Sequence, residues 1–545
     1  MPKQALKLTM WNYLQPVLVA LTPLSVIVST NIEKTKPAWI LRPFLLITLF
    51  ALSLAFICQR LFRNPQLGMV MASLIAVLFL YSGQLFTAIN KFSNRFGPIS
   101  GELPIEQLRQ QLICGLTLAI QILLLLMLSQ GLKQRPRAVE KWLAILNIFT
   151  LTIFIGSFIR IIGTRLASEE ITVNPTGISA DDVDALSPPD PLPDIYYLVL
   201  DSYPGMESLQ QEFDYSNAGF LGYLEYRGFL VNNDALSNYY RSTFSIASTL
   251  NMDYIHDLAG RSEVEKLDGF GLSRSVRQSA IRRILSQFGY QTVAFSSGFF
   301  YSDVYDADVY YSVDGSGMNP LENSMLPWTL YSYLVPFLDS EAHSIYAPTY
   351  TSHIHRIDQT LDTLRNLGTL GTADAPLFVI AHILSPHPPF VFDSNGEITL
   401  PQRPFGLDDA GAFPGSLDEY REGFAGQTAF LNERLKGIIE SLLTTSPRPT
   451  ILILQGDHGT RWKCNMETAI CEDMRIAFSI LNARYLPGVD ASEIEAALSP
   501  VNTFRMILNA YFDGQIPYLP DDSFISIGDE LVVEDMEWVE FPKGD

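Results

Sequence analysis

Acidic side chains are absent from five long apolar stretches in the first third of this 545-residue sequence. The stretches are roughly Leu14–Val28, Ile40–Cys58, Met69–Ile89, Leu112–Leu132 and Trp142–Ile162. Most of them approach the ~20 residues that a helix needs to cross the hydrocarbon core of a bilayer. Two lysines precede the first stretch, as in a signal peptide, but we see no small-residue cleavage site and four more stretches follow. We therefore expect an α-helical membrane domain of about five transmembrane helices at residues 1–165.

Basic residues are scarce after this region, and the charge changes sign there. Residues 1–165 carry 16 Lys and Arg against 4 Asp and Glu, whereas the remainder carries 21 against 54. The most basic loop, residues 133–141, is expected on the cytoplasmic side by the positive-inside rule. With five spans, the N-terminus is then cytoplasmic and the C-terminal part extracytoplasmic, in a bacterial-type plasma membrane. The bias is modest, because four basic residues fall on the other side: Lys34, Lys36, Lys91 and Arg95. The acidic C-terminal part argues against nucleic acid as a partner.

Cysteine is rare, with four residues in the whole chain. Cys58 and Cys114 lie in apolar stretches, and Cys464 and Cys471 lie close together in the C-terminal part. Outside the cytoplasm a short-range disulfide between the second pair is expected, whereas inside it would be unusual. The alternative is two unrelated buried thiols.

Alternating strands and helices characterise the C-terminal part. Residues 166–193 form a Pro-rich linker, a semi-rigid spacer, and a domain is expected at residues 194–545. DIYYLVLD, PLFVIAHI and ILILQ are continuous apolar runs typical of buried parallel strands, and MRIAFSILNA resembles another strand. Residues 273–288 are predicted as one amphipathic helix. The expected fold is a doubly wound, mostly parallel α/β sheet covered on both faces.

Three of these strands end in polar side chains suited to metal binding. The first ends at Asp201, the second at His382, and the third at Asp457 and His458 between two glycines. Ligands in open α/β sheets bind beyond the carboxyl ends of strands, so these groups are expected to share one edge. Two carboxylates and an imidazole suit one divalent cation, which could be Zn, Mn or Mg. The alternative interpretation is a set of polar loops that follow core strands.

A hydroxyl nucleophile is expected in NYYRSTFSIASTLNM, residues 238–252. Ser242 or Thr243 stands where a helix begins, and either residue could simply be an N-cap. A hydroxyl at that place also faces the positive end of the helix dipole, which favours an anion such as phosphate. A metal contact would lower the pKa of the hydroxyl and make it a nucleophile.

From Asp194 to about Phe524, the chain resembles the sulfatase-like branch of the alkaline phosphatase superfamily. The motifs that carry the resemblance are LDSYP, NYYRSTFSIAS, AHILSPHPPFVFD, ILILQGDHG and SPVNTFRMILNAYF. Membrane-bound members, namely lipoteichoic acid synthases and phosphoethanolamine transferases, share the layout of about five spans followed by an extracytoplasmic domain. The resemblance implies that Asp201, Asp457 and His458 hold the metal. It points to Ser242 as nucleophile by spacing, and to Thr243 by residue type.

The sequence also departs from its relatives in this branch. Sulfatases carry a Cys or Ser in a Cys-x-Pro-x-Arg type motif, and neither Cys nor Pro occurs near Ser242. Sulfate ester hydrolysis by that route is therefore disfavoured. The early motif is Asp-Ser rather than Asp-Asp, so a calcium site of the sulfatase type or a two-metal site lacks one ligand, and a single metal is favoured.

Four further residues are candidates for binding the substrate. The resemblance implies that His387, between two prolines, binds phosphate or protonates a leaving group, although it could be a packed loop residue. Arg241 and Arg461 are the basic residues nearest the nucleophile and the Asp-His pair, and arginine suits phosphate; both could instead be surface residues. His382 is a lesser candidate, which could be a core residue.

Three hypotheses about function follow from these observations. The leading one is a membrane-anchored, metal-dependent phospho-group transferase or phosphodiesterase that acts on a membrane lipid or envelope glycan. The second is a sulfuric ester or phosphonate hydrolase of the same superfamily. The third is a catalytically degenerate module that binds a glycan or partner.

Overall fold

The computed structural model divides the chain into two compact units. One unit, here called the membrane unit, comprises residues 1–169 and 317–349, and the other, the α/β unit, comprises residues 170–316 and 350–545. The structure describes residues 10–32, 35, 37–94, 103–166, 175, 177–261, 269–312, 317–331, 343–370, 375–401, 403, 405–409, 412–465, 470–489, 499–526, 536–539 and 541. The two lysines before the first span, Lys34, Lys36, Arg95 and most of the first half of the predicted linker lie outside these residues. Within the rest of the linker, helix α6 spans Ala180–Asp184.

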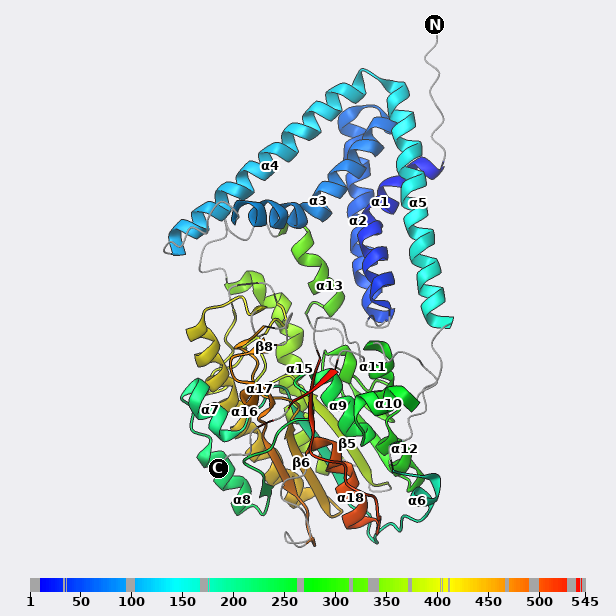
Figure 1. The fold of residues 1–545 in the computed structure, drawn as a ribbon. Helices are drawn as coiled ribbons and strands as arrows, with labels where there is room; N and C mark the ends of the chain where they lie inside the picture. The colour runs from blue at the N-terminus through cyan, green and yellow to red at the C-terminus, as the bar shows by residue number, and fades with distance from the viewer. Residues whose placement is uncertain are drawn as a thin grey trace. The chain divides into compact units, whose positions relative to one another are not determined.

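Long apolar helices make up most of the membrane unit (Figure 1). They are α1 (Met10–Thr30), α2 (Pro37–Phe62), α3 (Pro65–Asn94), α4 (Leu103–Lys133) and α5 (Pro136–Leu166). The apolar parts of α2 to α5 are long enough to cross a bilayer, whereas that of α1, Leu14–Thr30, is shorter. Among the described residues, four of the five expected spans therefore meet the length criterion, and the fifth is a shorter apolar helix.

A segment from the C-terminal half of the sequence packs against these helices. It contains α13 (Pro320–Met325) and the 3-10 helix η3 (Leu326–Trp328), and Leu321 belongs to a core shared with α1, α2 and α3. The Asn319 amide donates a hydrogen bond to the Trp39 carbonyl (3.2 Å), and the Leu330 N–H donates one to the Phe79 carbonyl (2.8 Å). If α2 and α3 cross a bilayer, this segment lies toward the same side of the bilayer as the first residues of α2 and the region of α3 near Phe79.

Seven strands form the central sheet of the α/β unit, in the order β2-β9-β6-β1-β5-β3-β4. Their bounds are β1 Asp194–Leu200, β2 Leu230–Val231, β3 Gln291–Phe295, β4 Val309–Tyr311, β5 Leu377–Ile383, β6 Thr450–Gly456 and β9 Asn482–Tyr485. The strands from β6 to β4 in this order pair in parallel, whereas β9 is antiparallel to both β6 and β2. All residues of β1, β5 and β6 are buried, as expected for strands covered on both faces. The predicted fold class is confirmed.

Helices cover both faces of the sheet. In Figure 1, α9 (Ser242–Asn251), α10 (Ile255–Arg261) and α12 (Ala280–Gln287) lie to one side of it, and α7 (Met206–Phe213), α8 (Ala218–Tyr226) and α16 (Leu417–Thr445) to the other. The remaining helices of eight or more residues are α11 (Gly269–Arg277), α15 (His343–Leu370), which begins in the membrane unit, and α18 (Thr503–Tyr511). Tyr197 of β1, Leu250 of α9 and Phe504 of α18 share one core.

Two predicted elements differ in the structure. The single helix expected at residues 273–288 is two helices, α11 and α12, separated at Ser279, whose backbone is extended (φ −61°, ψ 152°). The strand expected in MRIAFSILNA is a short helix, α17 (Met474–Phe478), followed by β9. The Asp473 side chain caps α17 by accepting a hydrogen bond from the Arg475 N–H. A short apolar run has no periodicity that distinguishes a helix from a strand, so local features of the chain determine which of the two forms.

Candidate metal and catalytic site

The carboxyl ends of two adjacent parallel strands, β1 and β6, bring the predicted metal ligands together. In the sheet register, Leu200 of β1 lies opposite Ile383 of β5 and Gly456 of β6. Asp201 and Asp457 each follow directly, so their side chains emerge side by side. One ligand atom from each of Asp201, Asp457 and His458 lies within 4.8 Å of the other two, and all three residues are buried.

Tight backbone turns hold the two carboxylates in place. Ser202 has a φ of 61°, in the left-handed region that residues other than glycine seldom adopt. In this conformation its N–H donates a hydrogen bond to Asp457 Oδ1 (2.9 Å). A Cβ atom on Gly456 or Gly459 would lie 2.3 Å or 2.1 Å from a backbone carbonyl oxygen. The two glycines around the Asp-His pair are therefore required by close packing of the chain.

His458 presents one ring nitrogen to the two carboxylates. Its Nδ1 lies 2.7 Å from the Gly459 carbonyl oxygen, which assigns the proton to Nδ1 as the donor. Nε2 then carries the lone pair and lies 3.8 Å from Asp201 Oδ1 and 3.7 Å from Asp457 Oδ2. Burial lowers the pKa of His458 against the opposing effect of Asp457, which favours the neutral imidazole that metals bind.

The Asp-Asp-His cluster fits a divalent cation. Asp457 Oδ2 is buried and has no hydrogen-bond partner within the described part of the chain, a costly state for a carboxylate oxygen unless a cation is bound. Burial opposes ionisation of Asp201, but His387, His382 and His458 hold the pKa of its carboxyl well below its usual range. Two carboxylates and a neutral imidazole with a backbone-bound Nδ1 are ligands suited to one divalent cation such as Zn, Mn or Mg.

His382 lies closer to the metal cluster than the sequence indicated. Its Nε2 is 3.3 Å from Asp201 Oδ2 and 3.8 Å from Asp457 Oδ2, and Ser302 Oγ lies 2.6 Å from its Nδ1. Burial lowers the pKa of His382, but the hydrogen bond and charge of Asp201 together with Asp457 raise it overall. His382 is not among the residues that line the cavity described next. Its role as a substrate ligand stays a prediction.

A cavity of about 270 Å³ lies beside the cluster at the start of α9. The N-cap of α9 is Arg241, without a side-chain capping bond, so neither Ser242 nor Thr243 is the N-cap. Ser242 Oγ lies 3.1 Å from His458 Nε2, the nitrogen that faces the carboxylates. Six of the predicted site residues line the cavity: Asp201, Arg241, Ser242, Thr243, His387 and Arg461. An anion in this cavity would meet two arginines and a helix N-terminus.

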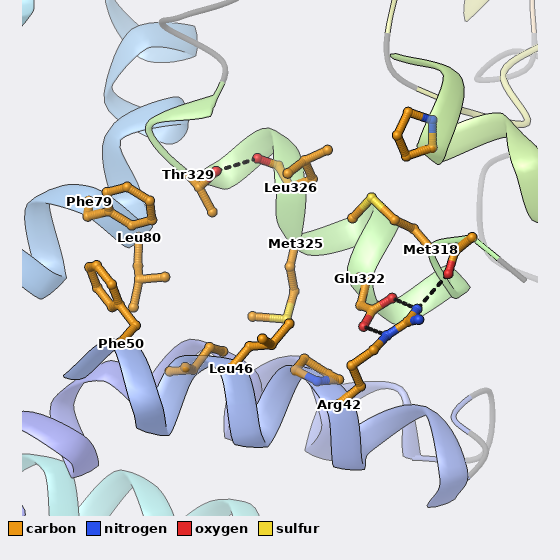
Figure 2. Close-up of a pocket in the computed structure, with 14 residues that line it drawn as sticks. Arg42, Leu46, Phe50, Phe79, Leu80, Met318, Glu322, Met325, Leu326 and Thr329 are labelled. Atoms are coloured by element: carbon orange, nitrogen blue, oxygen red, sulfur yellow. Dashed lines mark hydrogen bonds and ion pairs between the residues drawn. The ribbon is translucent and has the colours of Figure 1, made fainter. Parts of the chain in front are cut away.

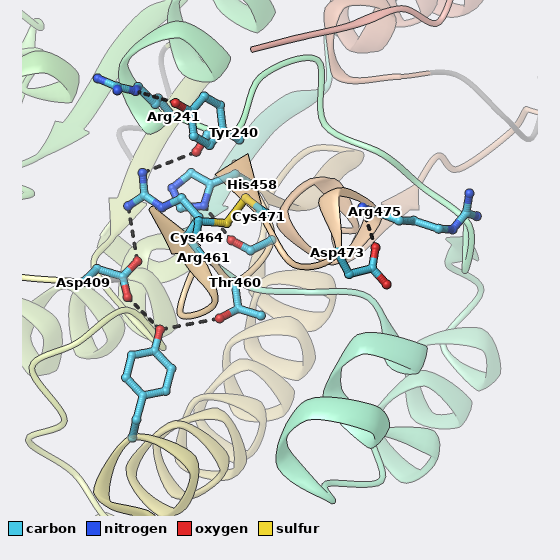
Figure 3. The surroundings of a disulfide bond; sticks show 12 residues. Tyr240, Arg241, Asp409, His458, Thr460, Arg461, Cys464, Cys471, Asp473 and Arg475 are labelled. Atoms are coloured by element: carbon cyan, nitrogen blue, oxygen red, sulfur yellow. Dashed lines mark hydrogen bonds and ion pairs between the residues drawn. A yellow bond between two sulfur atoms is a disulfide. The ribbon is translucent and has the colours of Figure 1, made fainter. Parts of the chain in front are cut away.

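Asp409, which sequence reasoning missed, holds two of these residues. Arg461 Nη2 lies 3.3 Å from Asp409 Oδ2, and His387 Nε2 lies 3.8 Å from the same oxygen. Tyr420 of α16 donates a hydrogen bond from its hydroxyl to Asp409 Oδ1 (2.7 Å), and Arg461 Nη1 donates one to the Tyr240 carbonyl (3.3 Å) (Figure 3). Asp409 lies in an irregular segment, where no periodicity or strand end could have indicated its role.

A disulfide follows the metal ligands in the chain. Cys464 and Cys471 are bonded, with Cα atoms 4.0 Å apart, across the hairpin of β7 (Cys464–Asn465) and β8 (Ile470–Cys471) (Figure 3). The Cys464 N–H donates a hydrogen bond to the carbonyl of Arg461, which lines the cavity (2.8 Å), so the hairpin is tied to a cavity residue by this bond. Cys58 and Cys114 are buried free thiols in the membrane unit.

The fold and the site define a class: an α/β protein with a buried Asp-Asp-His cluster, a helix-start hydroxyl and apolar helices of membrane-spanning length. No family model and no curated protein matches the chain. Solved structures do match. They include the C-terminal periplasmic domain of EcEptC from Escherichia coli in complex with Zn (10% identity, TM-score 0.39, covering 68% of this chain and 96% of that chain). They also include the lipoteichoic acid synthase LtaP from Listeria monocytogenes (14%, 0.36, 64% and 84%). A third is the soluble domain of lipooligosaccharide phosphoethanolamine transferase A from Neisseria meningitidis (10%, 0.37, 64% and 92%).

Proposed function

We propose that this protein is a membrane-anchored, metal-dependent phospho-group transferase or phosphodiesterase that acts on a membrane lipid or envelope glycan outside the cytoplasm. The observation that carries the proposal is the distance of 3.1 Å between Ser242 Oγ and His458 Nε2, beside two buried carboxylates. This distance favours Ser242 over Thr243 as the nucleophile.

Asp201, Asp457 and His458 would hold one divalent cation. Bound there, the cation would lower the pKa of the Ser242 hydroxyl and offset charge on the phosphoryl oxygens. Ser242 Oγ releases its proton to solvent and attacks phosphorus, the bond from phosphorus to the leaving alcohol breaks, and a phosphorylated Ser242 forms. Arg241 and Arg461 bind the remaining phosphoryl oxygens, and His387 gives a proton to the leaving alcohol. An acceptor alcohol or water then gives its proton to His387 and attacks the same phosphorus. The bond from phosphorus to Ser242 Oγ breaks, and Ser242 regains its proton from solvent.

The location of the reaction is supported by charge and by the disulfide. The basic loop at residues 133–141 favours a cytoplasmic N-terminus, and a disulfide between Cys464 and Cys471 is unusual in a reducing compartment. An anchored enzyme of this kind suits a substrate that stays in the membrane or the envelope.

Mass spectrometry of the full-length protein after exposure to candidate phospholipid donors tests the proposal. We expect a phospho-group adduct on Ser242, its absence in Ser242→Ala, and its persistence in Thr243→Val. Hydrolysis of an aryl phosphodiester should require a divalent metal and should be lost in Asp457→Ala. An adduct on Thr243 would mean that Thr243, and not Ser242, is the nucleophile. Turnover of aryl sulfate or phosphonate alone would favour a sulfuric ester or phosphonate hydrolase. Equal activity of wild type and Asp457→Ala would leave only the hypothesis of a binding module.

A further inference from the structure

The membrane unit contains an apolar cavity of about 610 Å³ between α2, α3 and the segment around α13 (Figure 2). Leu46 and Phe50 of α2, Leu80 of α3, and Met325 and Leu326 of the segment form much of its wall. The volume lies within the ~300–1,000 Å³ that is common for small-molecule sites. The apolar part of the cavity is a poor site for water, because the side chains there offer no hydrogen-bond partners. Its natural occupant is therefore apolar.

Polar groups gather at one end of this cavity. Arg42 donates from Nε to Glu322 Oε1 (2.6 Å) and from Nη2 to the Gly317 carbonyl (2.7 Å), and Nη2 also contacts Glu322 Oε2 (Figure 2). Arg42 is five residues from the first residue of α2, about 7.5 Å along the axis at ~1.5 Å per residue. Near the end of a membrane-spanning helix, that depth corresponds to the interface.

The apolar wall extends from this polar end toward the middle of α2. From Arg42 to Phe50 the lining residues of α2 advance eight positions, or ~12 Å. Phe50 and Phe79 meet at the far end with ring centroids 4.9 Å apart. A site that is polar at interface depth and apolar below it matches an amphiphile whose chain lies along α2.

The medium around the cavity decides which amphiphile is available. The apolar parts of α2 and α3, Pro37–Phe62 and Pro65–Phe86, are long enough to span a bilayer. Neighbouring large side chains of α2, such as Leu45 and Leu49, are exposed, as on a surface that contacts hydrocarbon. We infer that the cavity binds one acyl chain of a bilayer phospholipid, with the ester and headgroup region at the Arg42–Glu322 pair. The inference concerns the membrane unit and does not depend on the proposed reaction.

Photocrosslinking of the full-length protein tests the inference. The protein is reconstituted without detergent in phosphatidylcholine and phosphatidylglycerol vesicles that contain a phospholipid with a diazirine in one acyl chain. After irradiation, labelled peptides are mapped by mass spectrometry. We expect label on residues 317–331 in addition to the exposed surface of α4, which serves as an internal reference for bulk lipid contact. Label confined to α4 would overturn the inference.

Two adjacent substitutions separate cavity binding from general lipid contact. Leu46→Trp places an indole in the cavity and should reduce the label on residues 317–331 several-fold relative to α4. Leu45→Trp makes the same change at an exposed residue outside the cavity lining and should leave the ratio unchanged. Leu326→Trp fills the cavity from the opposite wall and should act like Leu46→Trp, which guards against one variant that fails to fold. Unchanged label in both filling variants, or labelling by a free diazirine fatty acid but not by the phospholipid, would refute the assignment.

Discussion

Replacing Asp409 by Asn tests whether a buried carboxylate outside the Asp-Asp-His cluster positions the proposed phosphate-binding residues of the cavity. Asn has the shape of Asp and can still accept the Tyr420 hydroxyl hydrogen bond at Oδ1. It removes the negative charge that lies 3.3 Å from Arg461 Nη2 and 3.8 Å from His387 Nε2. The expected effect is a looser Arg461 and a smaller loss of stability than in Asp409→Ala, because the hydrogen bond from Tyr420 is kept.

The magnitude follows from the contacts that change. A hydrogen bond that involves a charged group is worth about 1.5–3 kcal/mol, and each 1.4 kcal/mol is a factor of ten. If Arg461 binds the phosphoryl group in the transition state, Asp409→Asn should lower kcat/KM by roughly 10- to 150-fold. Tyr420→Phe leaves the charge of Asp409 in place and removes one donor that does not itself contact Arg461, so kcat/KM should fall less than in Asp409→Asn. Asp409→Ala leaves Arg461 without its partner and should destabilise the protein by about 3–5 kcal/mol.

The assay is metal-dependent hydrolysis of an aryl phosphodiester by full-length protein in nanodiscs, with thermal unfolding measured in parallel. Asp408→Asn is the matched control, because Asp408 is the adjacent carboxylate and is exposed. It should keep wild-type kcat/KM. Wild-type activity in Asp409→Asn, or an equal loss in Asp408→Asn, would show that the reasoning about Asp409 is wrong.

Three further changes have defined outcomes. Gly459→Ala forces a Cβ to within 2.1 Å of a backbone carbonyl oxygen, so the metal content measured by elemental analysis should fall. Gly222→Ala, in open space within α8, is the control and should be neutral or stabilising. Equal metal content in the two variants would contradict the packing argument. Replacing Cys464 and Cys471 by Ser opens a loop of about eight residues and should lower the free energy of unfolding by about 2–3 kcal/mol, measured as a lower thermal midpoint. An unchanged midpoint would mean that the hairpin does not need the disulfide. His458→Ala should reduce the amount of bound divalent metal and abolish the activity, and a chelator should abolish the activity of the wild type in the same way. Full metal occupancy in the variant would exclude His458 as a ligand.

The three strands of the site could be predicted because their apolar runs are continuous and each ends in a polar side chain. Asp201, Asp457 and His458 then follow from one rule, that parallel strands end at the same edge of a sheet. The break between α11 and α12 and the helix α17 could not be predicted, because no periodicity marks them. The chain is extended at Ser279 between α11 and α12, and the Asp473 side chain caps α17.

The sequence by itself determined that α2 to α5 are apolar helices of membrane-spanning length, and it determined the parallel core of the α/β unit and the candidate metal ligands, because these depend on local runs and strand ends. Only the tertiary structure placed Asp409 beside Arg461 and His387, and only it placed residues 317–331 against α2 and α3. Contacts of this kind join residues that lie 22 or more positions apart in the sequence. Their partners are selected by the packing of the folded chain, and no local pattern records that choice.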